Sequence, residues 1–244
     1  MTDRKSAKHL IIGGGIIGCS IAYHLAKSGE TDIVLLERAN LTEGATWHAA
    51  GLVGQLRSSR NTTRMLKKSV EMYDKLQNEE GFQFDWKKTG SLRLASSNER
   101  LLEAKRLATM ARSFDLEMLI ISPQEAKELF PLIEENGLHG AAFIPSDGYV
   151  DPSALCSAIA NAARKYGAQI NQNIAVLDFI TNDRRIKEVK TSNCVYEIEN
   201  VILAAGMWSR ELGAKLGIKV PTCAVEHQYI ITEPTGIEVG HYPT

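Results

Sequence analysis

The stretch Leu10-Ile11-Ile12-Gly13-Gly14-Gly15-Ile16-Ile17-Gly18 decides the fold. Its apolar start leads into the spacing GxGxxG, formed by Gly13, Gly15 and Gly18. In that motif the first glycine permits a tight turn, the second lets a pyrophosphate approach the backbone, and the third packs a helix closely on a strand. Because apolar residues then recur at helical spacing, the stretch predicts a strand, a glycine turn and a helix whose N-terminus can bind phosphate.

The next strand supplies the second half of this site. The unbroken apolar run Ile33–Leu36 is typical of a buried parallel strand, and it ends in Glu37. A carboxylate at that place can accept a hydrogen bond from a ribose hydroxyl and would repel the 2′-phosphate of NADP. The sequence therefore predicts a βαβ unit that binds a dinucleotide, with NAD and FAD both left open.

The composition is that of an ordinary globular protein, with 244 residues, a net charge of -1 and 23% charged side chains. This balance gives no electrostatic basis for binding nucleic acid. The apolar run after the polar segment 1–8 is too short for a signal peptide or a membrane span, so we expect no membrane partner. The spacing of histidines and cysteines suggests no metal site, and the four cysteines are expected to be reduced packing residues.

Hydrophobic periodicity predicts an α/β fold in two parts. A Rossmann-like parallel sheet with a β-meander is expected from residues 1–80 and 145–221, and a second, α+β domain from residues 81–144 and 222–244. The expected elements are a helix at 60–80 with Lys67 and Lys68 on its solvated face, strands at 91–95, 118–121 and 141–144, a capping box at 122–125, a helix from 152, a meander at 174–199, a buried strand at 201–204, a helix from 208 and a last strand at 224–232.

The segment after Glu37 is long and without periodicity, which is typical of functional loops. It contains Thr46-Trp47-His48-Ala49-Ala50-Gly51, in which His48 follows Glu37 by eleven residues. At about 3.3 Å per residue the loop can reach about 36 Å, from the ribose to the far end of an extended cofactor. A neutral imidazole nitrogen is a nucleophile at physiological pH.

Together these motifs resemble those of the sarcosine and dimethylglycine dehydrogenase family, of the D-amino-acid-oxidase-like superfamily. The resemblance rests on Thr46–Gly51 and on three further segments, Gly90–Ala95, Asp147–Pro152 and Ala204–Ser209. It implies that the first part is an FAD-binding domain of the glutathione-reductase type and the second a substrate domain. It also implies that His48 is bonded to the 8α-methyl carbon of FAD, the alternative being a histidine that only hydrogen-bonds the loop backbone. Only the N-terminal part of such enzymes is matched, so we expect a fragment that is incomplete at the C-terminus.

The resemblance also implies which residues contact cofactor and substrate. Ala205 and Gly206 are expected to pass under the FAD and the backbone of Val176 to meet the adenine, the alternatives being a plain strand end and a core residue. His227 is implied to face the substrate and to accept a proton or bind a carboxylate. Without the resemblance it would be a surface residue of a strand. The implied FAD contacts are Gly13, Gly15, Ile16, Ile17, Gly18, Glu37, Arg38, Thr46, His48, Ala50, Gly51, Leu52, Val176, Ala205, Gly206 and Trp208.

The implied activity is oxidative N-demethylation of a methylated glycine, sarcosine or dimethylglycine, by hydride transfer to flavin. An electron-transfer flavoprotein or O2 would accept the electrons, and tetrahydrofolate would bind only a longer relative. The expected location is the cytoplasm in a bacterium or the mitochondrial matrix in a eukaryote. Two alternatives remain: an NAD-dependent dehydrogenase, and a non-catalytic regulatory protein on the same scaffold. The second would be like the regulatory subunit of pyruvate dehydrogenase phosphatase, which lacks the attachment histidine.

Overall fold

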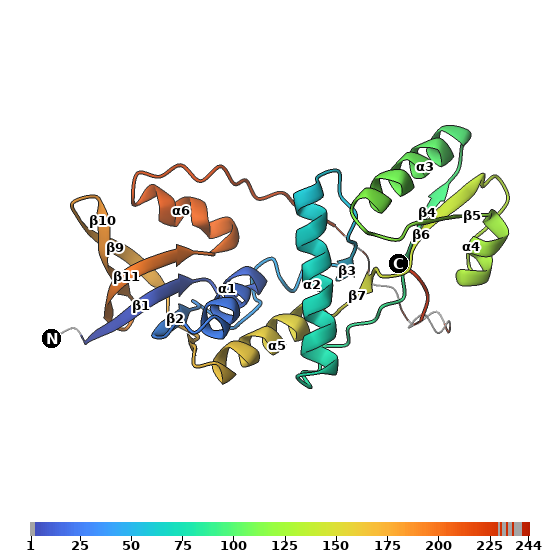
Figure 1. Cartoon of the computed structure of the whole chain (residues 1–244). Helices are drawn as coiled ribbons and strands as arrows, with labels where there is room; N and C mark the ends of the chain where they lie inside the picture. Colours follow the sequence, from blue (N-terminus) through green and yellow to red (C-terminus); the bar gives the residue numbers. More distant parts are fainter. Residues whose placement is uncertain (1–2, 229, 231–232, 234–235, 237–240) are drawn as a thin grey trace. The chain divides into compact units, whose positions relative to one another are not determined.

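The computed structural model describes residues 3–228, 230, 233, 236 and 241–244. The chain forms two compact units, the first made of residues 1–50 and 152–230 and the second of residues 51–151 and 231–244 (Figure 1). These boundaries differ from those that the sequence suggested, because helix α2 (Arg60–Asn78) belongs to the second unit. Its side chains bond within that unit, as when Asp74 accepts a hydrogen bond from the indole of Trp86 at 2.9 Å.

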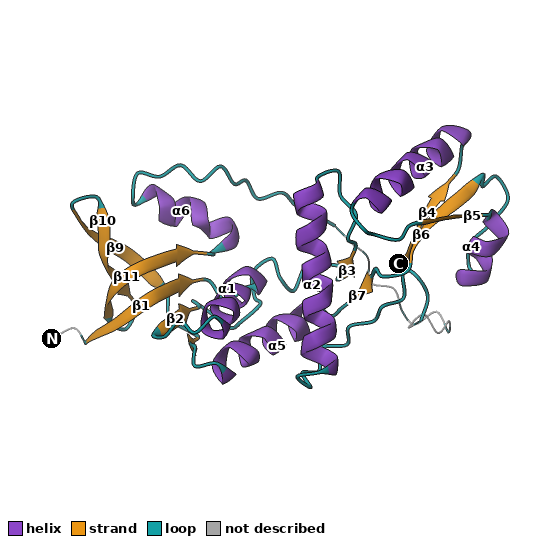
Figure 2. Ribbon diagram, viewed as in Figure 1, coloured by secondary structure: helices purple, strands orange, loops and turns teal. Residues whose placement is uncertain are grey.

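A six-stranded mixed sheet forms the first unit (Figure 2). Its four strands at one side are parallel, and its last two turn back antiparallel as a meander. The predicted α/β class, a parallel sheet with a meander, is confirmed. The strands in spatial order are β8 (Gln169–Asn171), β2 (Ile33–Leu36), β1 (Arg4–Ile12), β11 (Val195–Leu203), β10 (Arg185–Thr191) and β9 (Val176–Asn182).

Strand β11 shows where the sequence-based division of the sheet was wrong. The third meander strand and the predicted separate strand at 201–204 are one continuous strand. Strand β11 pairs antiparallel with β10 through residues 195–197 and parallel with β1 along its length. The same pairing places the start of β1 at Arg4, ahead of its apolar residues, because Arg4 pairs with Val195.

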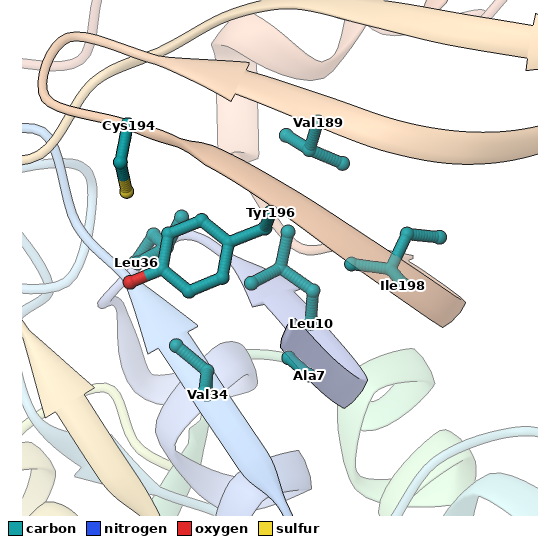
Figure 3. Packing of buried hydrophobic residues seen from close by; sticks show 8 residues of the cluster. All are labelled: Ala7, Leu10, Val34, Leu36, Val189, Cys194, Tyr196 and Ile198. Carbon is teal, nitrogen blue, oxygen red and sulfur yellow. The ribbon is translucent and has the colours of Figure 1, made fainter. Parts of the chain in front are cut away.

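The core beside this sheet comes from alternate residues of β1, β2, β10 and β11. Leu10 and Val34 are paired across neighbouring strands and lie against Tyr196, Ile198 and Val189 (Figure 3). All five side chains are buried. Their apolar area fixes the strand register, because a slip by one residue would turn each of them to the opposite face.

The helices of the first unit are α1 (Ile16–Lys27), α5 (Pro152–Lys165) and α6 (Ser209–Ala214), with a 3₁₀ turn, η1 (Gly206–Trp208), before the last. Helices α1 and α5 pack on one another through small residues such as Ala22, Ala160 and Ala163, all completely buried. After α1, Glu30 accepts hydrogen bonds from Lys8 at 2.6 Å and His9 at 3.1 Å. The bond from Lys8 is the main cause that lowers the pKa of Glu30.

The second unit holds two antiparallel sheets. One has the order β4 (Ser91–Ala95), β6 (Gly140–Ile144), β5 (Leu119–Ile121), and the other pairs β3 (Leu52–Val53) with β7 (Gly148–Tyr149). Besides α2 it contains α3 (Asn98–Ser113) and α4 (Pro123–Leu129). The capping box predicted at the start of α4 is confirmed: Ser122 and Glu125 each bond the backbone of the other.

Lys67 is not simply solvated, as its place on the polar face of α2 suggested. Its ammonium donates hydrogen bonds to the carbonyl oxygens of Phe114 and Asp115, just past the end of α3. A cation there satisfies carbonyls that the helix leaves free and opposes the negative end of its dipole. Lys68 is exposed and pairs with Glu71 one turn along α2.

The predicted last strand at 224–232 is not found in its described part. Residues 221–228 contain neither helix nor strand and are exposed, while 229, 231 and 232 lie outside the described residues. The side chains of 224–228 are exposed, so no burial against a sheet stabilises a strand there. Within the part of the chain that the structure describes, no helix is long and apolar enough to cross a membrane, and no three His, Cys, Asp or Glu side chains gather as metal ligands do.

Candidate dinucleotide site

The glycine loop lies where β1 ends and is held by backbone contacts on both sides. Gly13 donates its N–H to the carbonyl of Leu36 at 2.9 Å, at the end of β2. A Cβ on Gly13 would lie 2.3 Å from the carbonyl oxygen of Ala204, and its φ of +117° suits only glycine. A Cβ on Gly18 would lie 1.9 Å from the carbonyl oxygen of Gly13. Both positions therefore require glycine because of contacts within the polypeptide, whether or not a ligand is bound.

Strand β1 lies between β2 on one side and β11 on the other, so its carboxyl end is a point where the strand order reverses. Ligands of open α/β sheets bind at such points. Helix α1 begins here at Ile16, with Gly15 as an N-cap that has no side chain. The positive end of the helix dipole makes this place suited to an anion such as a pyrophosphate.

Glu37 closes β2 and faces the same loop. Its carboxylate accepts a hydrogen bond from the N–H of Gly14 at 2.7 Å and one from Ala39 at 2.9 Å. A carboxylate has about four acceptor positions, so two remain for the hydroxyls of a ribose. The predicted role of Glu37 is chemically available, in addition to its role in holding the glycine loop.

Arg38 and Trp208 join the ends of β2 and β11. The guanidinium carbon of Arg38 lies 3.9 Å from the centre of the Trp208 ring, within the range of a cation–π interaction. A Cβ on Gly44 would be 3.4 Å from the same ring, so the loop that follows β2 packs against Trp208. The sequence selected both residues as cofactor contacts and gave no sign of this pairing.

The loop that carries His48 runs back over the glycine loop. Thr42 donates its N–H to the carbonyl of Gly14 at 3.2 Å, and the hydroxyl of Thr46 accepts the N–H of Ile16 at 3.1 Å. The Nδ1 atom of His48 is 3.0 Å from the carbonyl oxygen of Gly44. A carbonyl only accepts, so Nδ1 carries the proton and, in the neutral ring, Nε2 carries the lone pair. The side chain of His48 is exposed, with Trp47 against it at 4.1 Å between ring centres.

The remaining predicted residues are less closely grouped. Val176 begins β9 and packs against the core beside the sheet, and Ala205 and Gly206 follow β11, with Ala205 capping η1. Ile17 is exposed in the first turn of α1. The loop residue Ala50 is exposed at the end of the first unit, whereas Gly51 and Leu52 begin the second. His227 is exposed in the irregular segment 221–228, and its catalytic role stays a prediction.

Two cysteines under the glycine loop carry contacts that the sequence did not reveal. Cys19 of α1 and Cys156 of α5 both donate to the carbonyl oxygen of Gly14, at 3.7 and 3.8 Å. Both thiols are completely buried, and the hydrogen bond to Cys156 together with burial raises the pKa of Cys19. The Cys19 thiol is therefore a neutral donor to the loop.

A central parallel strand with a glycine loop at its carboxyl end, and a carboxylate closing the next strand, define a dinucleotide-binding protein. The family model described as FAD dependent oxidoreductase matches residues 8–244, and the chain belongs to this family. The choice between NAD and FAD, which the glycine motif left open, is thereby decided in favour of FAD.

Two relatives align with nearly the whole of this chain. It is 38% identical to the mitochondrial sarcosine dehydrogenase of Mus musculus over 235 residues, which cover 94% of this chain and 26% of that protein. The mitochondrial dimethylglycine dehydrogenase of Rattus norvegicus is also 38% identical, over 229 residues that cover 94% of this chain and 27% of the relative. The chain thus spans about a quarter of the length of these relatives.

Among solved structures, the L-proline dehydrogenase from P. horikoshii superposes with a TM-score of 0.84 at 32% identity. The superposition covers 89% of this chain and 57% of that one. The two chains therefore share a fold, in agreement with the family assignment.

The residues present fit FAD. Gly13 and Gly18 shape a turn that a Cβ would fill, Gly15 gives the positive end of α1 no side chain that would cover it, and Glu37 keeps acceptor positions for a ribose.

Proposed function

We propose that this chain binds FAD covalently through His48 and is the flavin-binding part of an enzyme that oxidatively demethylates a methylated glycine, sarcosine or dimethylglycine. The observation that supports it best is the state of His48. The bond from Nδ1 to the carbonyl of Gly44 directs the lone pair of the neutral ring to Nε2, which has no hydrogen-bond partner among the described residues. A nucleophilic nitrogen on an exposed loop over a dinucleotide site suits attachment to the 8α-methyl carbon.

The alternative, a histidine that only hydrogen-bonds the loop backbone, agrees with the same bond. That bond uses one ring nitrogen and leaves Nε2 for the proposed attachment. The two roles therefore differ in whether Nε2 reacts, which the experiment below measures.

Each part of the site has a proposed task. The first turn of α1, with Ile16 and Ile17, binds the pyrophosphate; Glu37 binds the adenosine ribose; Arg38 and Trp208 border the cofactor. When bound, the flavin supplies the two-electron acceptor for the amine. We assign Val176, Ala205 and Gly206, together with Ala50, Gly51 and Leu52, to the cofactor as well, on the resemblance to sarcosine and dimethylglycine dehydrogenases.

The first unit is proposed to be the FAD-binding domain and the second a portion of the substrate domain. The relatives that share 38% identity are named for sarcosine and dimethylglycine, two amino acids that differ by one methyl group. A pocket separates such substrates by only about 1–3 kcal/mol. We propose His227 as the residue that takes the ammonium proton or binds the carboxylate.

The partners and location follow from the same proposal. The electrons would leave to an electron-transfer flavoprotein or to O2, and tetrahydrofolate would bind in a longer protein only. Both relatives are named as mitochondrial, which fits the mitochondrial matrix in a eukaryote, with the cytoplasm as the bacterial counterpart.

The test is the intact mass and visible absorbance of the purified chain after incubation with FAD and denaturation in acid. A covalent flavin survives this treatment and adds its mass to the polypeptide. We expect retained flavin in the wild type, none in His48→Ala, and retained flavin in the control His139→Ala, whose histidine bonds Asn98 in the second unit. A colourless wild type at the mass of the bare polypeptide contradicts covalent attachment and favours the regulatory alternative.

A further inference from the structure

The first turn of helix α1 is capped from a distant part of the chain. Its N-cap, Gly15, has no side chain, so the N–H of Ile16 has no local acceptor. The hydroxyl of Thr46, thirty residues along the chain, accepts that N–H at 3.1 Å. A Cβ on Gly15 would lie 3.1 Å from the same hydroxyl oxygen, tighter than an ordinary contact. The second glycine of the motif therefore makes room for Thr46 in addition to any phosphate.

Thr46 is also fixed within its own loop, two residues before His48. Its carbonyl accepts the N–H of Ala49 at 3.3 Å, which encloses His48 in a turn. The loop has a second attachment to the glycine loop, where Thr42 donates to Gly14 at 3.2 Å. Through these bonds the place of His48 is set relative to the N-terminus of α1.

The Thr46 hydroxyl has one more bond to give. It accepts from Ile16, and its own O–H is not donated to any described residue. A hydroxyl can accept and donate at once, and a donor at the N-terminus of a helix is well placed for an anionic oxygen. Such a bond to a charged oxygen is about twice as strong as one between neutral groups.

We propose that Thr46 is a positioning residue that couples the phosphate site to the attachment loop. Its oxygen holds the loop on the N-terminus of α1, and its proton goes to a pyrophosphate oxygen, so that binding of the phosphates fixes His48 in the position from which it reacts. This inference rests on the proposed function. Attachment forms a C–N bond between Nε2 and the 8α carbon, where one C–H bond breaks, and the imidazolium that results releases the proton of Nδ1. The two protons and two electrons released in total reduce O2 to H2O2.

Two variants separate the hydroxyl from the size of the side chain. Thr46→Val keeps the shape and removes both hydrogen bonds, and Thr46→Ser keeps the hydroxyl. The first measurement needs no cofactor: amide hydrogen exchange of Ile16, followed by NMR in the free chain. We expect exchange about fivefold faster in Thr46→Val, the effect of losing one neutral hydrogen bond, and nearly unchanged exchange in Thr46→Ser.

The second measurement uses FAD itself. The dissociation constant before attachment and the rate of gain of acid-stable flavin at saturating FAD are compared among the three proteins. We expect Thr46→Val to weaken binding about tenfold or more, as for loss of a charge-assisted bond, and to attach FAD more slowly even when saturated. Thr46→Ser should recover most of both. Recovery by serine distinguishes positioning by the hydroxyl from a general loss of folding.

The outcomes are decisive in each case. Unchanged Ile16 exchange in Thr46→Val overturns the cap, and faster exchange with unaltered FAD affinity and attachment rate overturns the coupling. If the wild type binds FAD but keeps none in acid, the proposed attachment fails, while exchange and affinity still decide the role of Thr46. A wild type that binds no FAD overturns both.

Discussion

Replacing Gly18 by alanine tests how closely helix α1 must approach the glycine loop. The new Cβ would lie 1.9 Å from the carbonyl oxygen of Gly13 and 3.1 Å from its carbon. Both atoms belong to the backbone, so neither can rotate away. Ordinary contact begins near 3.4 Å, so helix and loop must separate by about 1.5 Å.

The cost follows from what that separation disturbs. Helix α1 buries Cys19, Ala22 and Tyr23 almost completely, and gaps of 0.5–1 Å already lose about a quarter to a half of the dispersion attraction between facing atoms. Overpacking of this kind costs about 1–3 kcal/mol, and alanine returns about 0.8 kcal/mol through its helix propensity. We therefore expect a net loss of about 1–2 kcal/mol, equivalent to a fall of about 2–8 °C in Tm for a chain of this length.

The assay is thermal unfolding of the free chain, followed by titration with FAD. Gly15→Ala is the matched control, because its Cβ meets only the Thr46 hydroxyl, at 3.1 Å, in a backbone conformation that alanine adopts readily. Gly15→Ala should keep its Tm within about 2 °C and lose FAD affinity, whereas Gly18→Ala should lose both. A Gly18→Ala protein as stable as the wild type would refute the packing argument.

Three further changes give separate tests. Lys67→Met removes the cation bonded to the carbonyls after α3 and should cost about 1 kcal/mol in urea unfolding, whereas Lys68→Met should stay within about 0.5 kcal/mol; equal effects would contradict the capping role. Glu30→Gln should make Tm fall less steeply below pH 4.5. The Glu30 carboxyl has a lowered pKa, so it stabilises the fold fully above its ordinary pKa of 4.5 and loses this effect as the pH falls through the lowered pKa. Arg38→Met should shift the fluorescence of Trp208 and destabilise the first unit by about 0.5–1 kcal/mol; an unchanged emission spectrum would count against the stacked pair.

The sequence predicted the parts of the site that depend on local rules. Gly13, Gly18 and Glu37 were identified because backbone approach and strand ends impose the same residue types wherever they occur. The capping box at Ser122 was found for the same reason, since its two hydrogen bonds join residues three apart. Spacing along the chain is sufficient evidence for such features.

Features that join distant segments were missed. Continuity of β11 depends on its pairing with β1, and the polar residues Glu199 and Asn200 made the strand look like two. The bonds from Lys67 to α3 and from Thr46 to α1 depend on tertiary placement, with no signal in the spacing of the residues. Helix α2 has an amphipathic pattern that fits either unit equally well, so its assignment needed the contacts themselves.

The backbone at Thr42 shows that the attachment loop is held in place by more than its own preferences. Its φ is +74°, a conformation that costs a β-branched residue on the order of 1–3 kcal/mol. Such strain persists only where surrounding contacts oppose it, and here Thr42 donates to Gly14 and accepts from Trp47. These contacts hold most of the loop in place before a cofactor binds, and the proposed bond from Thr46 to a phosphate would complete the ordering. Less ordering remains to be done on binding, which favours attachment at His48 over a loop that would fold only around the flavin.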